Sequence, residues 1–296
     1  MLILWKTKNV KGQMQKMKIG IVGLGLIGGS LGIDLRSQGH FVTGISRQNN
    51  TCQIALAKGI ADRASNKFEA LSDAEVVIVC TPIAAIASTI EQIIPNINAD
   101  TIITDVGSVK YPVVQSCSQL WSNFIGGHPM AGTSYSGIDA ALPNLFTNAA
   151  YVFTPTANSK PEHVEQLKAI ALDLNAIPYV CDAKIHDRAV SYISHLPVMV
   201  SASLIKVCLQ EEPDTLKLAQ ILASSGFRDT SRVGGGNPEL GVMMAKYNQQ
   251  ELLRSLYSYR DNLDEIIGLI EEEKWQNLER LLKSNGEVRP KFLNGQ

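Results

Sequence analysis

The chain has 296 residues, 45% of them hydrophobic and 19% charged, and its 27 basic side chains nearly balance 28 acidic ones. This composition is that of a soluble globular protein, and the length predicts two domains that each bury a core. A disulfide-stapled miniprotein and a disordered chain are excluded. A net charge of -1 without a long basic run gives no electrostatic footprint for nucleic acid or for a membrane surface, so a small-molecule ligand is favoured.

The cysteines and the N-terminus indicate where the protein acts. The five cysteines are widely spaced and form no C-x-x-C pair, which favours free thiols in a reducing compartment over disulfides or a metal site. The cytoplasm is the expected location, and no metal is expected. The apolar start of residues 1–16 is too short for a secretory signal, so this segment is expected to be an unstructured leader or an upstream start, outside the fold.

From Met17 onward, short β-branched runs alternate with helical segments, which is typical of a parallel sheet with crossover helices. The predicted strands are 18–22, 41–45, 76–80, 102–105, 124–126, 150–154 and 178–181. After Asp182 the strands stop, and the predicted helices are 183–210, 214–224, 238–246 and 249–282. The fold class is therefore α/β, with a mostly parallel sheet in residues 17–182 and an all-helical domain in residues 183–296.

Three glycines follow the first predicted strand and open a helical run, in the pattern Gly23-x-Gly25-x-x-Gly28. The first permits a tight turn, the second lets backbone approach a pyrophosphate, and the third allows close packing of helix on sheet. Leu26 and Ile27 lie within the same turn. Because a strand precedes and a helix and a second strand follow, we predict a Rossmann-type nucleotide-binding domain.

The second predicted strand ends in Ser46-Arg47, where NAD sites carry an acidic residue. Serine and arginine can both bond a ribose phosphate, which favours NADP over NAD. Gln48 and Asn49 are candidate additional polar contacts, and a solvated loop charge is the alternative interpretation of Arg47.

Two further loops follow predicted strands at their carboxyl ends, the edge where open parallel sheets bind ligands. Thr81 and Pro82 are expected to border the nicotinamide half of the cofactor, or to be a simple strand-to-helix turn. Residues 107–110 form the second loop.

Five histidines are present, of which His40 and His163 are expected on the surface. His128 is expected in a loop after strand 124–126, among glycines and a proline. A neutral imidazole there can accept a proton from a hydroxyl while hydride leaves the same carbon. A structural loop histidine is the open alternative.

The helix predicted around residues 189–209 is apolar nearly all round, although it contains His195 and Pro197. These residues favour a buried helix over a membrane span. It must be covered either inside the second domain or by a homodimer interface, and we expect a homodimer.

Five motifs follow one another along the chain: Gly23–Ser30, Asp105–Lys110, Gly127–Gly132, His186-Asp187 with Ser194–Pro197, and Gly226–Arg232. Together and in this order they resemble the prephenate and arogenate dehydrogenase family of tyrosine biosynthesis, and most closely its cyanobacterial-type arogenate dehydrogenases. The resemblance extends from Met17 to the C-terminus, and it implies NADP-dependent oxidative decarboxylation of L-arogenate to L-tyrosine.

The resemblance also implies site residues. His128 would take the proton of the ring C4 hydroxyl as hydride passes to the nicotinamide, and Ser108 would bond the same hydroxyl or His128, or cap a helix. Arg232 would grip a substrate carboxylate, with Arg228 as its rival. His195 would line the substrate cavity, or be a core histidine.

The alternatives concern substrate and class. Relatives that prefer prephenate often carry a second histidine where this chain has Val198, which favours arogenate; a prephenate dehydrogenase that yields 4-hydroxyphenylpyruvate is the alternative. A β-hydroxyacid dehydrogenase would need a catalytic lysine, for which Lys206 has the wrong surroundings. A non-catalytic NADP-responsive protein is a further rival, and no fused mutase or regulatory domain is expected.

Overall fold

The computed structural model describes residues 16–133 and 135–293. The expected leader, residues 1–16, lies outside the described residues except for Lys16. The chain divides into two compact units, and the division falls between Asp187 and Arg188. The sequence boundary drawn near Asp182 falls slightly earlier in the chain.

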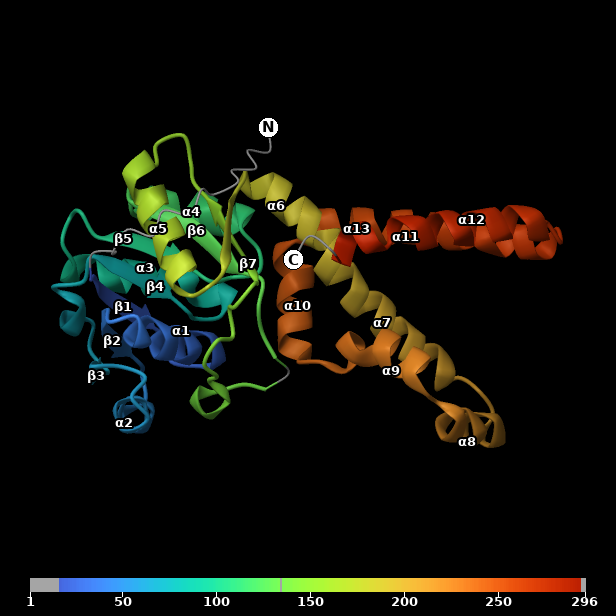
Figure 1. Ribbon diagram of the computed structural model, residues 1–296, viewed down its shortest axis with the longest axis horizontal. Helices are drawn as coiled ribbons and strands as arrows, with labels where there is room; N and C mark the ends of the chain where they lie inside the picture. The colour runs from blue at the N-terminus through green and yellow to red at the C-terminus, as the bar shows by residue number, and fades with distance from the viewer. Residues whose placement is uncertain (1–15, 134, 294–296) are drawn as a thin grey trace. The chain divides into compact units, whose positions relative to one another are not determined.

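The first unit is built on one eight-stranded sheet in the order β3-β2-β1-β4-β5-β6-β7-β8 (Figure 1). Every neighbouring pair is parallel except β6 and β7, which run antiparallel. The strands are β1 (Lys18–Val22), β2 (Phe41–Ile45), β3 (Arg63–Ser65), β4 (Val76–Val79), β5 (Ile102–Asp105), β6 (Phe124–Pro129), β7 (Ala150–Thr154) and β8 (Ile177–Val180). The predicted α/β class with a mostly parallel sheet is confirmed.

Helices cover both faces of this sheet, as right-handed crossovers require. α1 contacts α5, and α3 contacts α4, so these two pairs mark opposite faces. The core between helices and sheet is apolar and includes Ile19, Leu31, Leu35 and Ile78, all nearly inaccessible. The helices are α1 (Leu26–Ser37), α2 (Asn49–Ala57), α3 (Ile86–Ile93), α4 (Tyr111–Leu120) and α5 (Pro161–Asp173).

Strand β6 is longer than the sequence predicts, and the expectation that His128 lies in a loop is wrong. His128 pairs with Val152 across the antiparallel β6–β7 ladder. The glycines before it permit close packing instead of a turn. A Cβ on Gly126 would lie 2.5 Å from Thr154 Oγ1, and one on Gly127 would lie 2.5 Å from the Asp105 carbonyl oxygen.

Two histidines expected on the surface are buried instead. His40 is 4% exposed and His163 is 8% exposed. The Nδ1 atom of His40 accepts from the backbone N–H of Met17 at 3.2 Å, and its Nε2 lies 2.8 Å from Asp173 Oδ2. His40 therefore joins the start of β1 to the end of α5.

The second unit is helical, as predicted (Figure 1). The unit boundary falls within α6 (Ala183–Val190), and a π-helical turn, Ser191–His195, leads directly into α7 (Leu196–Cys208). Pro197 lacks a backbone N–H, and a wide turn before it accommodates the lost helical bond. The remaining helices are α8 (Pro213–Leu222), α9 (Ser225–Ser231), α10 (Pro238–Tyr247), α11 (Gln249–Glu271), α12 (Trp275–Val288) and α13 (Pro290–Leu293).

The helical run Ala183–Cys208 has the length and apolar composition of a membrane-crossing helix, a test that core helices of soluble proteins also pass. Only 22% of its most apolar window is buried within the chain. The alternative that the second domain itself buries this helix is therefore wrong for a single chain. Ile193, Val207 and Leu209 are all more than half exposed.

Candidate active site

The glycine-rich turn after β1 has the geometry that a dinucleotide site needs. Gly23 adopts φ +102°, and a Cβ there would lie 2.7 Å from the Cys80 carbonyl oxygen. A Cβ on Gly28 would lie 2.0 Å from the carbonyl oxygen of Gly23. Around the Cβ position of Gly25, by contrast, no described atom lies within 4 Å. The space beside Gly25 faces the N-terminus of α1, where backbone N–H groups favour an anion.

The turn lies between the carboxyl ends of two strands. The Gly23 N–H donates to the Ile45 carbonyl at 2.9 Å, at the end of β2. The Cys80 carbonyl, which Gly23 abuts, is at the end of β4. Ser46-Arg47 and Thr81-Pro82 therefore flank the glycine turn, Leu26 and Ile27 continue it into α1, and all of them lie at one edge of the sheet.

The flanking residues differ in how far their polar groups are already used. The Ser46 hydroxyl accepts from the N–H of Gln48 at 3.3 Å. Arg47 is exposed, and its guanidinium makes no hydrogen bond or ion pair with residues 16–133 or 135–293. The Thr81 hydroxyl is buried and has no hydrogen-bond partner among the described residues. This edge therefore offers a cation and a hydroxyl suited to a phosphorylated dinucleotide.

A buried ion pair supports the next strand ends along the sheet. The ammonium of Lys110 pairs with the carboxylate of Asp105, and both side chains are inaccessible to solvent. Lys110 Nζ also donates to the Gly127 carbonyl at 2.6 Å, and the Gly127 N–H donates to Asp105 Oδ1 at 3.1 Å. Burial lowers the pKa of Lys110, and the Asp105 charge opposes that shift. The pair fixes loop 106–110 against β6.

Ser108 lies in this fixed loop, between β5 and α4. Its hydroxyl is buried and has no hydrogen-bond partner within the part of the chain that the structure describes. The helix-capping alternative is not supported, because Lys110 is the N-cap residue of α4 and no side-chain cap hydrogen bond is found there.

Three buried side chains of the first unit form a continuous hydrogen-bonded chain, which we call the histidine relay: His128, His186 and Asp187. His128 Nδ1 lies 2.9 Å from His186 Nε2, and the two rings meet edge to face. His186 Nδ1 lies 2.8 Å from Asp187 Oδ1. Each member of the relay is at most 7% exposed. The relay therefore joins β6 to the start of α6.

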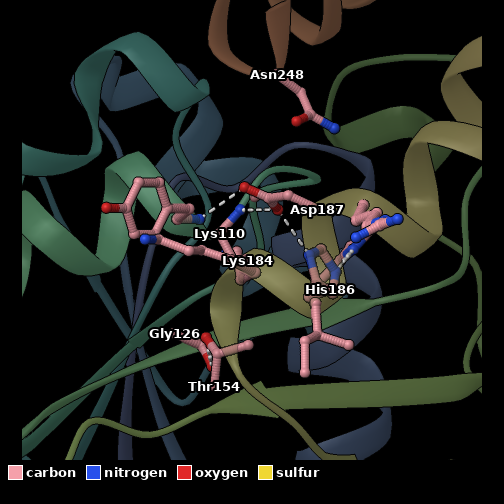
Figure 2. Close-up of polar contacts among 12 residues, drawn as sticks. Lys110, Gly126, Thr154, Lys184, His186, Asp187 and Asn248 are labelled. Carbon is pink, nitrogen blue, oxygen red and sulfur yellow. Dashed lines mark hydrogen bonds and ion pairs between the residues drawn. The ribbon is translucent and has the colours of Figure 1, made fainter. Parts of the chain in front are cut away.

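The carboxylate of Asp187 also holds the N-terminus of α4 (Figure 2). Its Oδ1 accepts from the N–H of Lys110 at 2.7 Å, and its Oδ2 accepts from the N–H of Tyr111 at 2.8 Å. A carboxylate at this position satisfies otherwise unpaired N–H groups and interacts favourably with the helix dipole. Lys184, one turn earlier on α6, lies 4.7 Å from the Tyr111 ring.

The other predicted substrate residues belong to the second unit. His195 is fully buried at the end of the π-helical turn, and its Nδ1 lies 3.1 Å from Asn248 Nδ2. Arg228 is exposed on α9, and its guanidinium pairs with the neighbouring Asp229 at 3.2 Å. Arg232 is exposed at the start of a 3₁₀ turn, Arg232–Gly235. The core-histidine alternative for His195 is thus compatible with its burial.

Sequence reasoning did not assign roles to several residues of these networks. They are Asp105, Lys110, His186, Asp187 and Asn248. The first four stand inside motifs that the sequence displays, but no spacing rule connects Asp187 to α4 across more than seventy residues. Only the fold brings these partners together.

A mononucleotide-binding sheet, a glycine turn shaped for a pyrophosphate and a buried imidazole at the carboxyl edge define a dinucleotide-dependent dehydrogenase. The family model of the prephenate dehydrogenase nucleotide-binding domain matches residues 31–180, and that of the prephenate dehydrogenase dimerization domain matches residues 182–284. The chain belongs to the prephenate dehydrogenase family, whose members include arogenate dehydrogenases.

Two similar proteins illustrate this membership, and a third shares the fold. The prephenate dehydrogenase of Bacillus subtilis strain 168 is 33% identical over 93% of this chain and 76% of its own length. The crystal structure of Synechocystis arogenate dehydrogenase is 53% identical, with a TM-score of 0.85 over 93% of this chain and all of that one. The structure of Aquifex aeolicus prephenate dehydrogenase with hydroxyphenyl propionate and NAD+ shares the fold, with a TM-score of 0.87 at 24% identity, over 96% of this chain and 99% of that one.

The family assignment decides between the broad alternatives. The chain is an oxidoreductase of tyrosine biosynthesis, as the motifs implied. The β-hydroxyacid dehydrogenase alternative is disfavoured as well by Lys206, which lies exposed on α7. The non-catalytic binding protein has no support from these relatives.

Proposed function

We propose that the protein catalyses the NADP-dependent oxidative decarboxylation of L-arogenate to L-tyrosine. The observation that carries the proposal is His128, a buried imidazole at the carboxyl edge of a dinucleotide-binding sheet. Two further observations favour arogenate over prephenate. A relative with 53% identity is an arogenate dehydrogenase, and Val198 stands where prephenate-preferring enzymes often have a second histidine.

The cofactor would bind along the strand ends that surround the glycine turn. Gly23, Gly25 and Gly28 would receive the pyrophosphate at the N-terminus of α1. Ser46 and Arg47 would hold the ribose phosphate, since no carboxylate follows β2, and Thr81 and Pro82 would border the nicotinamide. When bound, the nicotinamide accepts a hydride from the substrate ring.

His128 would accept the proton of the C4 hydroxyl while the hydride leaves the same carbon. Ser108, whose hydroxyl is buried and without a partner among the described residues, would donate a hydrogen bond to the developing carbonyl oxygen. The bond between the ring and its carboxylate then breaks to release carbon dioxide, and its electron pair completes the aromatic ring. Aromatisation provides the driving force, so the protein mainly orients the reactants.

Three residues that the family resemblance singles out are the candidates for binding the substrate. Arg232 would bind a substrate carboxylate through its two-pronged guanidinium, and Arg228 is the neighbouring candidate for the same role. His195, whose Nδ1 lies 3.1 Å from Asn248 Nδ2, would line the substrate cavity.

We also propose that the protein is a homodimer of the cytoplasm. The helical unit matches a family dimerization domain, and the exposed apolar side chains on α7, α8, α11 and α12 need a cover. All five cysteines are free thiols, which suits a reducing compartment.

Replacing His128 with Asn tests the proposed chemistry, because asparagine keeps polarity and removes the base. The kcat for reduced cofactor formation, followed by absorbance with NADP and arogenate, should fall by about 10²- to 10⁴-fold. Wild-type speed in this variant would remove His128 from the mechanism. Parallel assays of the wild type with arogenate and prephenate, each with NADP and NAD, distinguish the proposed reaction from the prephenate alternative.

A further inference from the structure

The histidine relay contains more groups than the proposed base requires. His186 and Asp187 are consecutive residues of α6, yet His128 is the one member of the relay to which the proposed reaction assigns a role. Both are about 3% exposed, so they are not ordinary surface charges. Buried polar groups of this kind need a structural or chemical reason.

The hydrogen bonds of Asp187 determine which nitrogen of His186 carries its proton. Asp187 Oδ1 accepts from the Lys110 N–H and Oδ2 from the Tyr111 N–H, so both oxygens act as acceptors. A carboxylate cannot donate, and therefore the bond of 2.8 Å from His186 Nδ1 must be made by an N–H on that nitrogen. In a neutral His186, the lone pair then lies on Nε2.

The same donor-acceptor argument applies to the ring of His128. His186 Nε2, which carries the lone pair, lies 2.9 Å from His128 Nδ1, so His128 must donate an N–H from Nδ1. In a neutral His128 the lone pair consequently lies on Nε2. A general base needs its lone pair on the nitrogen that meets the substrate.

We infer that Asp187, acting through His186, fixes the tautomer of His128 so that Nε2 is the nitrogen that accepts the substrate proton. His186 and Asp187 are positioning residues for the proposed reaction. This inference rests on the proposed role of His128.

The relay would also stabilise the positive charge that the reaction creates on His128. When the C4 hydroxyl proton passes to Nε2, His128 becomes an imidazolium with an N–H on each nitrogen. Its Nδ1–H bond to His186 becomes charge-assisted, and the Asp187 carboxylate lies two hydrogen bonds away. No proton leaves the relay in this step, and the hydride leaves on the cofactor.

Asp187 has a second role as the partner of the α4 N-terminus, so a variant must separate positioning from folding. Asp187→Asn is nearly isosteric, and with its carbonyl oxygen in the place of Oδ2 it can still accept from the Tyr111 N–H, whereas the Lys110 N–H loses its acceptor. Its amide group would then face His186 Nδ1 and donate to it. This would move the His186 proton to Nε2, reverse the bond to His128 and leave His128 with its proton on Nε2.

We expect Asp187→Asn to lower kcat by at least about 10²-fold while KM for substrate and cofactor stays unchanged. His186→Phe keeps the edge-to-face ring contact and removes both hydrogen bonds, so it should show the same split. His163→Phe is the matched control, because His163 is also a buried histidine of the first unit but lies on α5 outside the relay; it should retain wild-type kcat.

Imidazole ¹⁵N NMR of the full-length, histidine-labelled protein reads the tautomers directly and does not depend on turnover. The His128 signals are assigned by their loss in His128→Asn. Wild-type His128 should be protonated on Nδ1, and Asp187→Asn should move the proton to Nε2. An Nε2-protonated His128 in the wild type, or full kcat in Asp187→Asn, would overturn the inference. Failure of the proposed function would instead appear as absent turnover of both substrates with the tautomers as described.

Discussion

At the scale of single residues, the groups proposed for proton transfer and those proposed for anion binding differ in how they are held by their neighbours. The groups proposed for proton transfer are buried and fixed by neighbours on β5, α4 and α6. The cations proposed to bind anions, Arg47 and Arg232, are exposed. A buried donor set suits a reaction step that tolerates little misplacement, and an exposed guanidinium suits capture of a charged ligand from water.

Cofactor choice should depend on Arg47. Arg47→Asp replaces a cation with a carboxylate that repels the ribose phosphate of NADP and can bond the free ribose hydroxyls of NAD. A charge-assisted hydrogen bond contributes about 1.5 to 3 kcal/mol, so KM for NADP should rise by about 10- to 100-fold while NAD becomes the better cofactor. Steady-state kinetics with both cofactors measures this, and Arg47→Lys, which keeps the charge, is the control. Unchanged selectivity would place the phosphate contact elsewhere.

Substrate capture should depend on Arg232. Arg232→Ala removes the proposed carboxylate contact and should raise KM for arogenate by about 10- to 100-fold with a smaller effect on KM for NADP. Arg228→Ala, four residues away on α9, is the matched comparison because its side chain already faces Asp229. The reverse result, an unaltered KM in Arg232→Ala and a raised one in Arg228→Ala, would assign the role to Arg228.

At the scale of elements, glycines decide how closely backbones approach one another. In the β1–α1 turn, Gly28 sits against the Gly23 carbonyl, whereas Gly25 borders open space. In β6, Gly126 and Gly127 sit against β7 and β5. The same residue type therefore serves close packing at three positions and, at Gly25, leaves the space in which we propose that the cofactor binds.

Two substitutions in the β1–α1 turn should separate these functions. Gly28→Ala places a methyl group 2.0 Å from a backbone carbonyl oxygen, so the free energy of unfolding should fall by about 3 kcal/mol in a denaturant titration. Gly25→Ala meets no described atom within 4 Å, so stability should stay at the wild-type value while NADP affinity, measured by calorimetry, falls about tenfold or ~1.4 kcal/mol. Equal stability of the two variants would contradict this division.

The elements also show where sequence reasoning succeeds. Apolar β-branched runs such as Val76–Val79 identify strands because burial on both faces of a parallel sheet demands them. Strand β3 has only three residues, Arg63–Ser65, and no such run. The segment around His128 contains glycine and proline, which usually indicate a loop. Here the glycines are needed because residues on β5 and β7 pack directly against them, and the local sequence does not reveal those neighbours.

At the scale of the whole molecule, the two units have different surfaces. The first unit encloses an apolar core between helices and sheet. The helical unit leaves many large apolar side chains exposed on α7, α8, α11 and α12. The sequence predicts that the apolar helix must be covered. Whether its own domain covers it depends on how all the helices pack, and the sequence pattern of one helix does not contain that information.

A second copy of the chain should therefore be stably bound. Sedimentation at micromolar concentration should give twice the chain mass of 32.2 kDa, because interfaces of permanent dimers bury about 2,000 Å² or more of largely apolar surface. Val207→Asp, in the exposed apolar part of α7, should weaken association, with Lys206→Asp on the same helix as the control for added charge. A wild-type chain that sediments as a monomer would contradict the proposal.

The wide π-helical turn at Ser191–His195 has a consequence for how this long helix can vary. Such a turn accommodates one residue more than an ordinary helical turn. Because the wide turn absorbs that extra residue, deleting a single residue there would let a regular helix run through with the later side chains on nearly the same faces. A deletion in a regular turn of α7 would instead rotate every later side chain by about 100° about the axis. The turn that holds His195 beside Asn248 is therefore where this long helix can lose a residue without turning the rest of α7.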